Sequence, residues 1–185
     1  MMTQKLICDE LLRLMGEKPF YRIKVTELVE RLGISRTTFY SNYDSIPDVL
    51  DKIEEGFLSG LDDAYLASEV IRSVIKSNYT AEYSVDATFE YLKTHLEVFR
   101  ILAGSNGNPN FKSKFSKRHE NVGNILFSSL QMSEAQKKIA TAALLGFQWN
   151  AYYWWAFHED EISAGEVRSF MADSIRRFFG NYVDV

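Results

Sequence analysis

The chain has 185 residues, of which 46% are hydrophobic and 25% charged, and it carries three prolines and one cysteine. These values exclude a disordered or collagen-like chain and a disulfide-stapled one, and they fit a folded protein of ordinary size. The three histidines, His95, His119 and His158, lie far apart and show no metal-ligand spacing. We therefore expect a cytoplasmic protein that holds no metal and needs no cofactor.

The net charge of −4 comes entirely from the residues after position 50, because the first 50 carry seven basic and seven acidic side chains. The start of the chain has no apolar run of the kind found in a secretory signal. Residues 139–157 carry no formal charge, but Thr141, Gln148 and Asn150 lie among them. These polar residues favour a protein interior over a lipid bilayer, so we expect no membrane contact.

Hydrophobic residues recur at helical spacing from the start of the chain. The pattern predicts a first helix that Thr3 opens and Gly16 closes in the left-handed conformation. It predicts a short second helix over residues 25–32. Ser35 is a suitable N-cap for a third, short helix, and Ser45 for a fourth.

The remaining sequence predicts a long helix over residues 80–103, opened by Thr80, and another around residues 119–130. Two S-x-x-[EQ] capping boxes then open the last two helices, the first of which is rich in aromatic residues. No segment alternates convincingly in a strand pattern, so the sequence predicts an all-α fold of about nine helices. The capping boxes are Ser133-x-x-Gln136, opening a helix that runs to about His158, and Ser163-x-x-Glu166, opening a helix that Gly180 can stop.

Residues 25–43, VTELVERLGISRTTFYSNY, have the spacing of a helix-turn-helix, with Gly33 in the turn and Ser35 at the start of the second helix. In this motif the second helix enters the DNA major groove. The alternative is an ordinary helical hairpin, in which the glycine and serine serve only the turn. The residues assigned to DNA binding are Ser35 at the start of the second helix, Arg36, Thr37 and Thr38 on its first turn, and Tyr40 and Asn42 one turn later.

The run IKVTELVERLGISRTTFYSNYDSIPDVL resembles the N-terminal domain of the TetR/AcrR family of transcriptional regulators, and its core G-I-S-x-x-T-F-Y is specific for that family. The resemblance implies a three-helix DNA-binding domain over residues 1–46 and a larger helical domain over residues 47–185, which binds a ligand and dimerises. It also assigns roles to single residues. Thr26 would contact a phosphate, Arg36 and Thr37 would contact bases, and Thr38, Tyr40 and Asn42 would contact the DNA backbone.

Seven aromatic residues within positions 147–157 span more than one helix face, so a single core contact cannot bury them all. The resemblance implies that the last two helices form a four-helix bundle with a second subunit, giving a homodimer. Simple core packing is the alternative for many of these rings. A small apolar or aromatic effector would need a few polar groups in an apolar wall. The candidates for that wall are His95, Phe99, Gln148 and Tyr152.

The residues and the resemblance together predict a ligand-responsive regulator, a repressor that binds palindromic operator DNA as a homodimer. A regulator of the same fold that acts as an activator, or through a protein partner, is the main alternative. The sequence holds no nucleophile elbow, metalloprotease motif or glycine-rich phosphate loop, so we expect no enzymatic activity. An all-α enzyme that uses the aromatic cavity is a more distant alternative.

Overall fold

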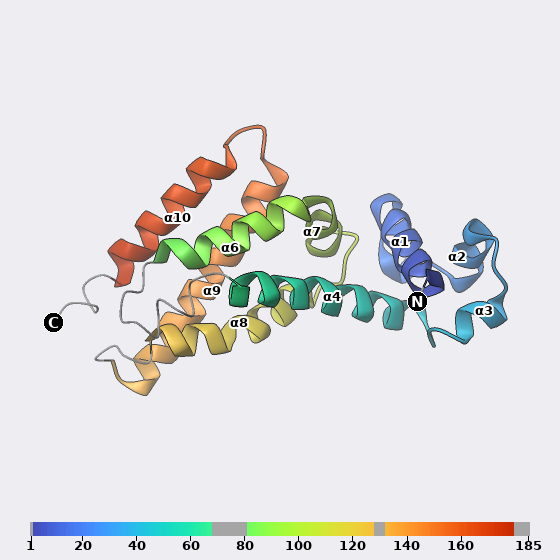
Figure 1. Ribbon diagram of the computed structural model, residues 1–185, viewed down its shortest axis with the longest axis horizontal. Helices are drawn as coiled ribbons and strands as arrows, with labels where there is room; N and C mark the ends of the chain where they lie inside the picture. The colour runs from blue at the N-terminus through green and yellow to red at the C-terminus, as the bar shows by residue number, and fades with distance from the viewer. Residues whose placement is uncertain (1, 68–80, 128–131, 180–185) are drawn as a thin grey trace. The chain divides into compact units, whose positions relative to one another are not determined.

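The computed structural model describes residues 2–67, 81–127 and 132–179 (Figure 1). Over these residues the protein has nine α-helices, one short 3-10 helix and no strand, which confirms the predicted all-α fold. None of these helices is long and apolar enough to cross a membrane. The elements are α1 (Met2–Glu17), η1 (Phe20–Arg22), α2 (Val25–Leu32), α3 (Arg36–Tyr40), α4 (Ile46–Ala67), α6 (Ala81–Thr94), α7 (Leu96–Ala103), α8 (Phe111–Phe127), α9 (Glu134–Phe157) and α10 (Ala164–Phe179).

The described residues form two compact units. The first unit contains α1, α2, α3 and α4 as far as Ser59, together with Glu97–Phe111 from the middle of the chain. The second unit contains the described residues of Gly60–Leu96 and those from Lys112 onward. The first unit is therefore assembled from two stretches that lie far apart in the sequence.

The first unit is built on a hydrophobic core that its three N-terminal helices share. Helix α1 packs against α2, and α2 packs against α3. Leu11, Leu28 and Phe39, one from each helix, are fully buried. The Cys8 Sγ atom lies 3.3 Å from Tyr43 Oη and joins α1 to the turn after α3, and burial raises the pKa of both groups. Helix α1 thus contacts both α2 and the turn that follows α3.

Aromatic side chains dominate the core of the second unit, in which α10 packs against α6 and α9. The ring of Phe89 on α6 lies 5.3 Å from that of Tyr152 and 4.8 Å from that of Trp155, both on α9. On α8, the ring of Phe115 lies 5.1 Å from that of Trp149. These contacts explain how α9 can carry so many aromatic residues, because some of its rings pack against α6 and another packs against α8.

Both predicted capping boxes are confirmed. The Ser133 Oγ atom accepts the Gln136 N–H at 3.3 Å, and Gln136 Oε1 accepts the Ser133 N–H at 2.8 Å. Ser163 and Glu166 repeat this exchange at 3.3 and 3.0 Å, and the hydrogen bonds from Ser163 lower the pKa of the Glu166 carboxyl. The predicted cap at Ser45 is also present, because its hydroxyl accepts the Asp48 N–H at 3.2 Å.

The predicted ends of the first helix are wrong. Helix α1 already includes Met2, so Thr3 lies inside it. Gly16 also lies inside α1, and the positive φ among the described glycines belongs to Gly33. The helix ends at Glu17, close to Pro19, because proline disfavours the helical conformation of the residue before it.

The predicted helix over residues 80–103 is interrupted, and this prediction is also wrong. Helix α6 ends at Thr94 and α7 begins at Leu96, with His95 between them. The Thr94 hydroxyl lies 3.1 Å from the Glu90 carbonyl oxygen and 2.9 Å from that of Tyr91, contacts that are known to bend helices. The expected helix ends at Thr80 and Gly180 lie outside the described residues.

Candidate nucleic-acid interface

The α2–α3 segment has the geometry that a helix-turn-helix requires. Helix α2 ends at Gly33, whose φ of 65° is a left-handed conformation that glycine adopts without strain. The N–H of Gly33 donates to Glu30 O at 3.2 Å, and the N–H of Ile34 donates to Val29 O at 3.1 Å. These bonds satisfy carbonyl groups at the end of α2 and turn the chain into α3.

Helix α3 begins with a side-chain cap. The Ser35 Oγ atom accepts the Thr38 N–H at 3.0 Å and lies 2.8 Å from the Thr38 hydroxyl. The two hydroxyl groups therefore bond to each other at the start of the helix. Arg36 and Thr37 are exposed on the same first turn. The sequence predicted all four residues to lie in the interface. In the structure, Ser35 and Thr38 form the helix cap, whereas Arg36 and Thr37 are exposed to solvent.

The other end of α3 presents one exposed aromatic ring. Tyr40 is 55% exposed, and its ring packs edge-on against buried Phe39 at 5.3 Å. Asn42 is half-buried, and its Nδ2 atom donates to Thr38 O at 2.8 Å. Asn42 thereby caps the last carbonyl groups of α3. Thr26, the remaining predicted contact, is half-buried on the first turn of α2.

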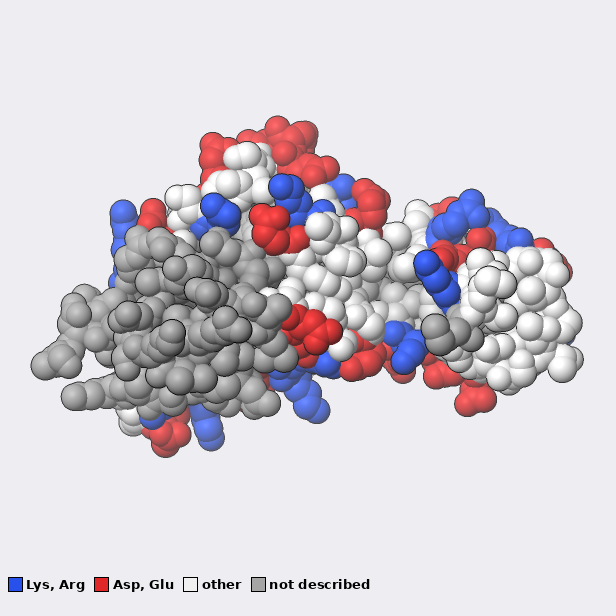
Figure 2. Space-filling model, viewed as in Figure 1, with Lys and Arg blue, Asp and Glu red and all other residues white. Residues whose placement is uncertain are grey.

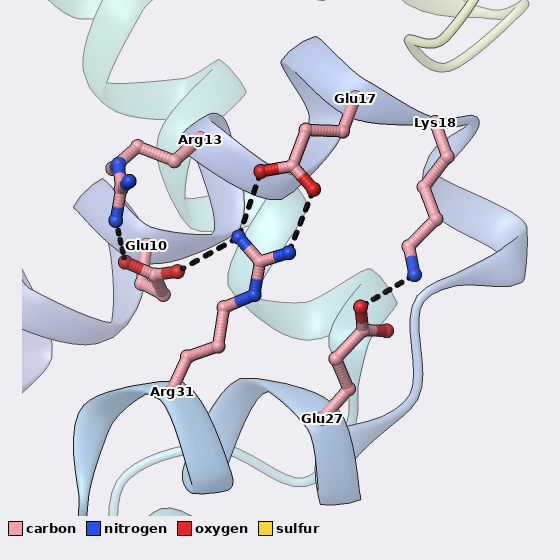
Figure 3. A network of polar contacts seen from close by, with 6 residues as sticks. All are labelled: Glu10, Arg13, Glu17, Lys18, Glu27 and Arg31. Carbon is pink, nitrogen blue, oxygen red and sulfur yellow. Dashed lines mark hydrogen bonds and ion pairs between the residues drawn. The ribbon is translucent and has the colours of Figure 1, made fainter.

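Part of the basic charge in this unit is used to join α1 to α2 (Figure 3). Arg31 on α2 forms two hydrogen bonds of 2.7 Å with Glu17 on α1, and this guanidinium lowers the pKa of the Glu17 carboxyl. The same Arg31 lies 3.7 Å from buried Glu10, which Arg13 also contacts at 2.9 Å. A further ion pair between Lys18 and Glu27 is shown in the same view.

Within residues 1–46, four other cations are exposed and form no ion pair with any described residue. Sequence reasoning did not single out Arg22 and Lys24, although they directly precede the first turn of α2, where Thr26 lies. Their position before a helix that has no side-chain cap was the available signal. In the view of Figure 2, Lys and Arg gather over α1 and α2, whereas the surface over α3 is mostly uncharged. The four exposed cations are Lys5, Arg22, Lys24 and Arg36.

The four predicted ligand residues are divided between the two units. Phe99 is fully buried in the first unit, where its ring stacks on Phe57 at 6.1 Å. His95, Gln148 and Tyr152 belong to the second unit. His95 is exposed and stacks on Tyr91, Gln148 is half-buried, and Tyr152 is buried. Within the described residues, no cluster of His, Cys, Asp and Glu could hold a metal ion.

Sequence reasoning missed His119 as a buried polar side chain of the second unit. His119 on α8 is buried, and its ring stacks on that of Phe115 at 4.4 Å. Its Nδ1 atom lies 2.8 Å from the Phe115 carbonyl oxygen and must donate to it. The Nε2 atom is then an acceptor, and it has no hydrogen-bond partner within the described residues. The available signal for burial of His119 was its position four residues after Phe115, which places both side chains on the same face of the helix.

Burial lowers the pKa of the His119 imidazole, so we expect the protein to lose stability as the pH falls below about 6.5. The unfolded chain binds a proton at His119 in that range while the folded protein resists it, so protonation favours unfolding. Urea denaturation at pH 7.5 and at pH 5.5 measures this difference, which His119→Phe should reduce. His158→Phe is the control, because that side chain is only half-buried at the C-cap of α9. An unchanged difference in His119→Phe would contradict the assignment.

An apolar groove lies between α9 and α10 in the second unit. Its volume is about 460 Å³, and its walls include Phe147 and Trp154 from α9 and Phe170 from α10. Phe170 is 63% exposed, and its ring lies 6.4 Å from that of Phe147. Ile139 and Phe157 add further exposed apolar surface on α9. Apolar surface gathered in this way is typical of a protein–protein contact.

No family model matches the chain, and no curated protein shows significant sequence similarity to it. Two crystal structures share its architecture. One is described as a transcriptional regulator of the TerR/AcrR family from Aquifex aeolicus VF5, with a TM-score of 0.67, 17% identity and coverage of 96% of this chain and 99% of that one.

The second is described as a TetR-family transcriptional regulator from Syntrophomonas wolfei str. Goettingen, with a TM-score of 0.66, 14% identity and coverage of 92% and 91% of the two chains. The protein therefore has the all-helical fold found in these two regulators. The resemblance that the helix-turn-helix residues suggested is confirmed at the level of the fold, over nearly the whole chain.

Proposed function

We propose that this protein is a TetR-like transcriptional regulator that binds operator DNA through α3 and releases it when a small molecule binds. The observation that carries the proposal is the capped α2–turn–α3 pair, which leaves Arg36 and Thr37 exposed at the start of α3. DNA contact is assigned to residues 1–46, and ligand binding and dimerisation to residues 47–185. The likeness of the whole chain to two such regulators supports this division of labour.

Within the interface, we assign base contact to Arg36 and Thr37 and backbone contact to Tyr40. Arginine recognises guanine through two hydrogen bonds in the major groove, and Arg36 has no acidic partner within the described residues to compete for its guanidinium. Thr26, Arg22 and Lys24 would contact phosphates beside α2. Ser35, Thr38 and Asn42 serve the interface by fixing α3 rather than by extending from it.

Arg36→Ala should weaken operator binding by about 1–3 kcal/mol and relax the preference at one base position. Tyr40→Phe should instead weaken binding to all sequences about equally, because a phosphate contact carries no sequence information. Binding to a panel of operators that differ by single bases measures both effects. If Arg36→Ala keeps the base preferences of the unaltered protein, Arg36 does not read the sequence.

We assign the α9–α10 groove to a second copy of the chain. The exposed rings of Trp154 and Phe170 belong to the last two helices, and a two-fold axis beside them would bury both faces against each other. Symmetry of this kind requires a palindromic operator, with half-sites about 34–36 Å apart. The dimer therefore explains both the apolar groove and the expected form of the DNA site.

Phe170→Glu should convert the dimer into a monomer, because it places a charge in the apolar contact without disturbing a buried position. Ser169→Glu is the matched control: it adds the same charge at the neighbouring exposed residue, on a different face of α10. Sedimentation at micromolar concentration distinguishes the two states. A monomeric unaltered protein, or a Phe170→Glu variant that remains dimeric, would contradict this assignment.

For the small molecule, we place the site in the second unit, beside His119. The Nε2 acceptor, which has no partner within the part of the chain that the structure describes, calls for a ligand that donates an N–H or O–H. The neighbouring rings of Phe115 and Trp149 favour an apolar or aromatic body. Gln148 and Tyr152 on α9 are the remaining candidates for its wall. Such a ligand must prefer the conformation that cannot bind DNA, since otherwise it would shift no equilibrium.

A further inference from the structure

Asn106, in the loop between α7 and α8, forms hydrogen bonds to the end of α1 and to the segment that connects α1 to α2. The Nδ2 atom of Asn106 donates to the Met15 carbonyl oxygen at 2.9 Å, although 91 positions separate the two residues. The backbone oxygen of Asn106 accepts the N–H of Phe20, also at 2.9 Å. All three residues belong to the first unit, to which the loop is joined as part of Glu97–Phe111.

These two bonds meet a specific need on either side of Pro19. The last carbonyl groups of α1 have no partner within the helix. Among the described residues, only that of Leu14 accepts a nearby backbone N–H, from Lys18 at 3.0 Å. Pro19 has no N–H to offer. Asn106 therefore supplies a donor to the end of α1 and an acceptor to the start of η1, which leads into α2.

The loop that presents Asn106 is itself held in place. A Cβ atom on Gly107 would lie 2.1 Å from the Leu102 carbonyl oxygen. The loop backbone at position 107 therefore packs so close to the end of α7 that only glycine fits there. The Asn108 Nδ2 atom lies 3.4 Å from Glu54 Oε2 on α4, and Asn108 Oδ1 accepts the Asn110 N–H at 3.0 Å. Asn106 thus extends from a fixed support.

We propose that Asn106 is a positioning residue for the helix-turn-helix: it fixes the direction in which the chain leaves α1 and so sets the placement of α2 and α3. The inference rests on the proposed DNA-binding function and adds a residue far outside the DNA-binding segment. Helix α2 is the neighbour of both α1 and α3, so a looser connection before α2 spreads α3 over more orientations. Only some of these orientations match the major groove.

Asn106→Asp tests the proposal, because it removes the donor without changing the size of the side chain. Asn110→Asp is the matched control: it adds the same charge at an exposed position of the same loop. The DNA probe is the duplex that the unaltered full-length protein selects from a random library. We expect Asn106→Asp to bind this duplex about fivefold to tenfold more weakly than Asn110→Asp. The salt dependence of binding should be unchanged, because no phosphate contact is lost.

Amide hydrogen exchange distinguishes positioning from general destabilisation. In Asn106→Asp, the amides of Lys18 and Phe20 should exchange about ten times faster while those of α9 keep their rates. Asn106→Ala and Asn110→Ala repeat the comparison without a charge. Equal affinity and equal exchange in the two aspartate variants would overturn the proposal, as would a uniform increase over all helices. If the unaltered protein selects no duplex, the DNA-binding function fails, and the exchange rates alone decide whether Asn106 holds the connection.

Discussion

Phe99→Ala is expected to lower the free energy of unfolding by about 3–5 kcal/mol, the usual cost of deleting a buried aromatic ring. Phe99 is 0% exposed, and its ring stacks on Phe57 at an interplanar angle of 18°. Phe57 in turn meets Phe111 edge-on at 5.9 Å. Because these rings come from α4, α7 and the start of α8, the cavity left by alanine would open where these three helices meet.

Urea denaturation measures this loss, and Tyr21→Ala is the control. Tyr21 is 67% exposed, so removal of its ring should change stability by no more than about 0.5 kcal/mol. A cost below about 1 kcal/mol for Phe99→Ala would show that the ring is dispensable for packing. That outcome would favour the ligand role that the sequence suggested for Phe99.

Gly107→Ala is expected to cost about 3 kcal/mol or more, because no rotation of a side chain can relieve a clash between Cβ and backbone. The added Cβ would lie 2.1 Å from Leu102 O and 2.8 Å from Ile101 O. The α7–α8 loop would have to shift, and Asn106 would lose its place. Operator binding should therefore fall together with stability.

Gly56→Ala is the matched control for this substitution. A Cβ atom at Gly56, an exposed residue inside α4, meets nothing within 4 Å. Alanine should stabilise the helix there by about 0.5–1 kcal/mol, because glycine loses more backbone entropy on folding. Thermal or urea denaturation of the two variants should thus give changes of opposite sign. A Gly107→Ala protein as stable as the unaltered one would contradict the close packing of this loop.

Local rules predicted the starts of α3, α4, α9 and α10, because a cap depends on residues three positions apart. Ser35, Ser133 and Ser163 each accept the backbone N–H that the sequence indicated. The helix-turn-helix was equally accessible, since Gly33 and the buried positions around it lie within one short run. The fold class followed from these local signals and the helical spacing of hydrophobic residues.

Contacts between distant segments could not be predicted in this way. The left-handed residue expected at Gly16 is absent, and the end of α1 is instead satisfied by Asn106 from another part of the chain. The break at His95 depends on hydrogen bonds from Thr94 that compete with a regular helix. Spacing also cannot distinguish a core ring from a ring that lines a cavity, so the ligand role of Phe99 stays a prediction.

The predicted DNA-binding residues show the same limit at finer scale. Sequence spacing places Asn42 one turn after Thr38, but it does not reveal that the Asn42 side-chain amide donates to the Thr38 carbonyl oxygen. It also cannot tell which cations are already paired, as Arg31 is with Glu17. The structure is needed to show that Arg22 and Lys24 are exposed and form no ion pair within the described residues.

Selection of duplexes from a random DNA library by the unaltered full-length protein tests the central claim most directly. The account predicts enrichment of a palindromic sequence whose half-sites lie about one helical turn apart, and its loss when Arg36 is replaced by alanine. Binding without enrichment of any sequence, or no binding at low salt, would contradict the proposal that α3 reads operator DNA.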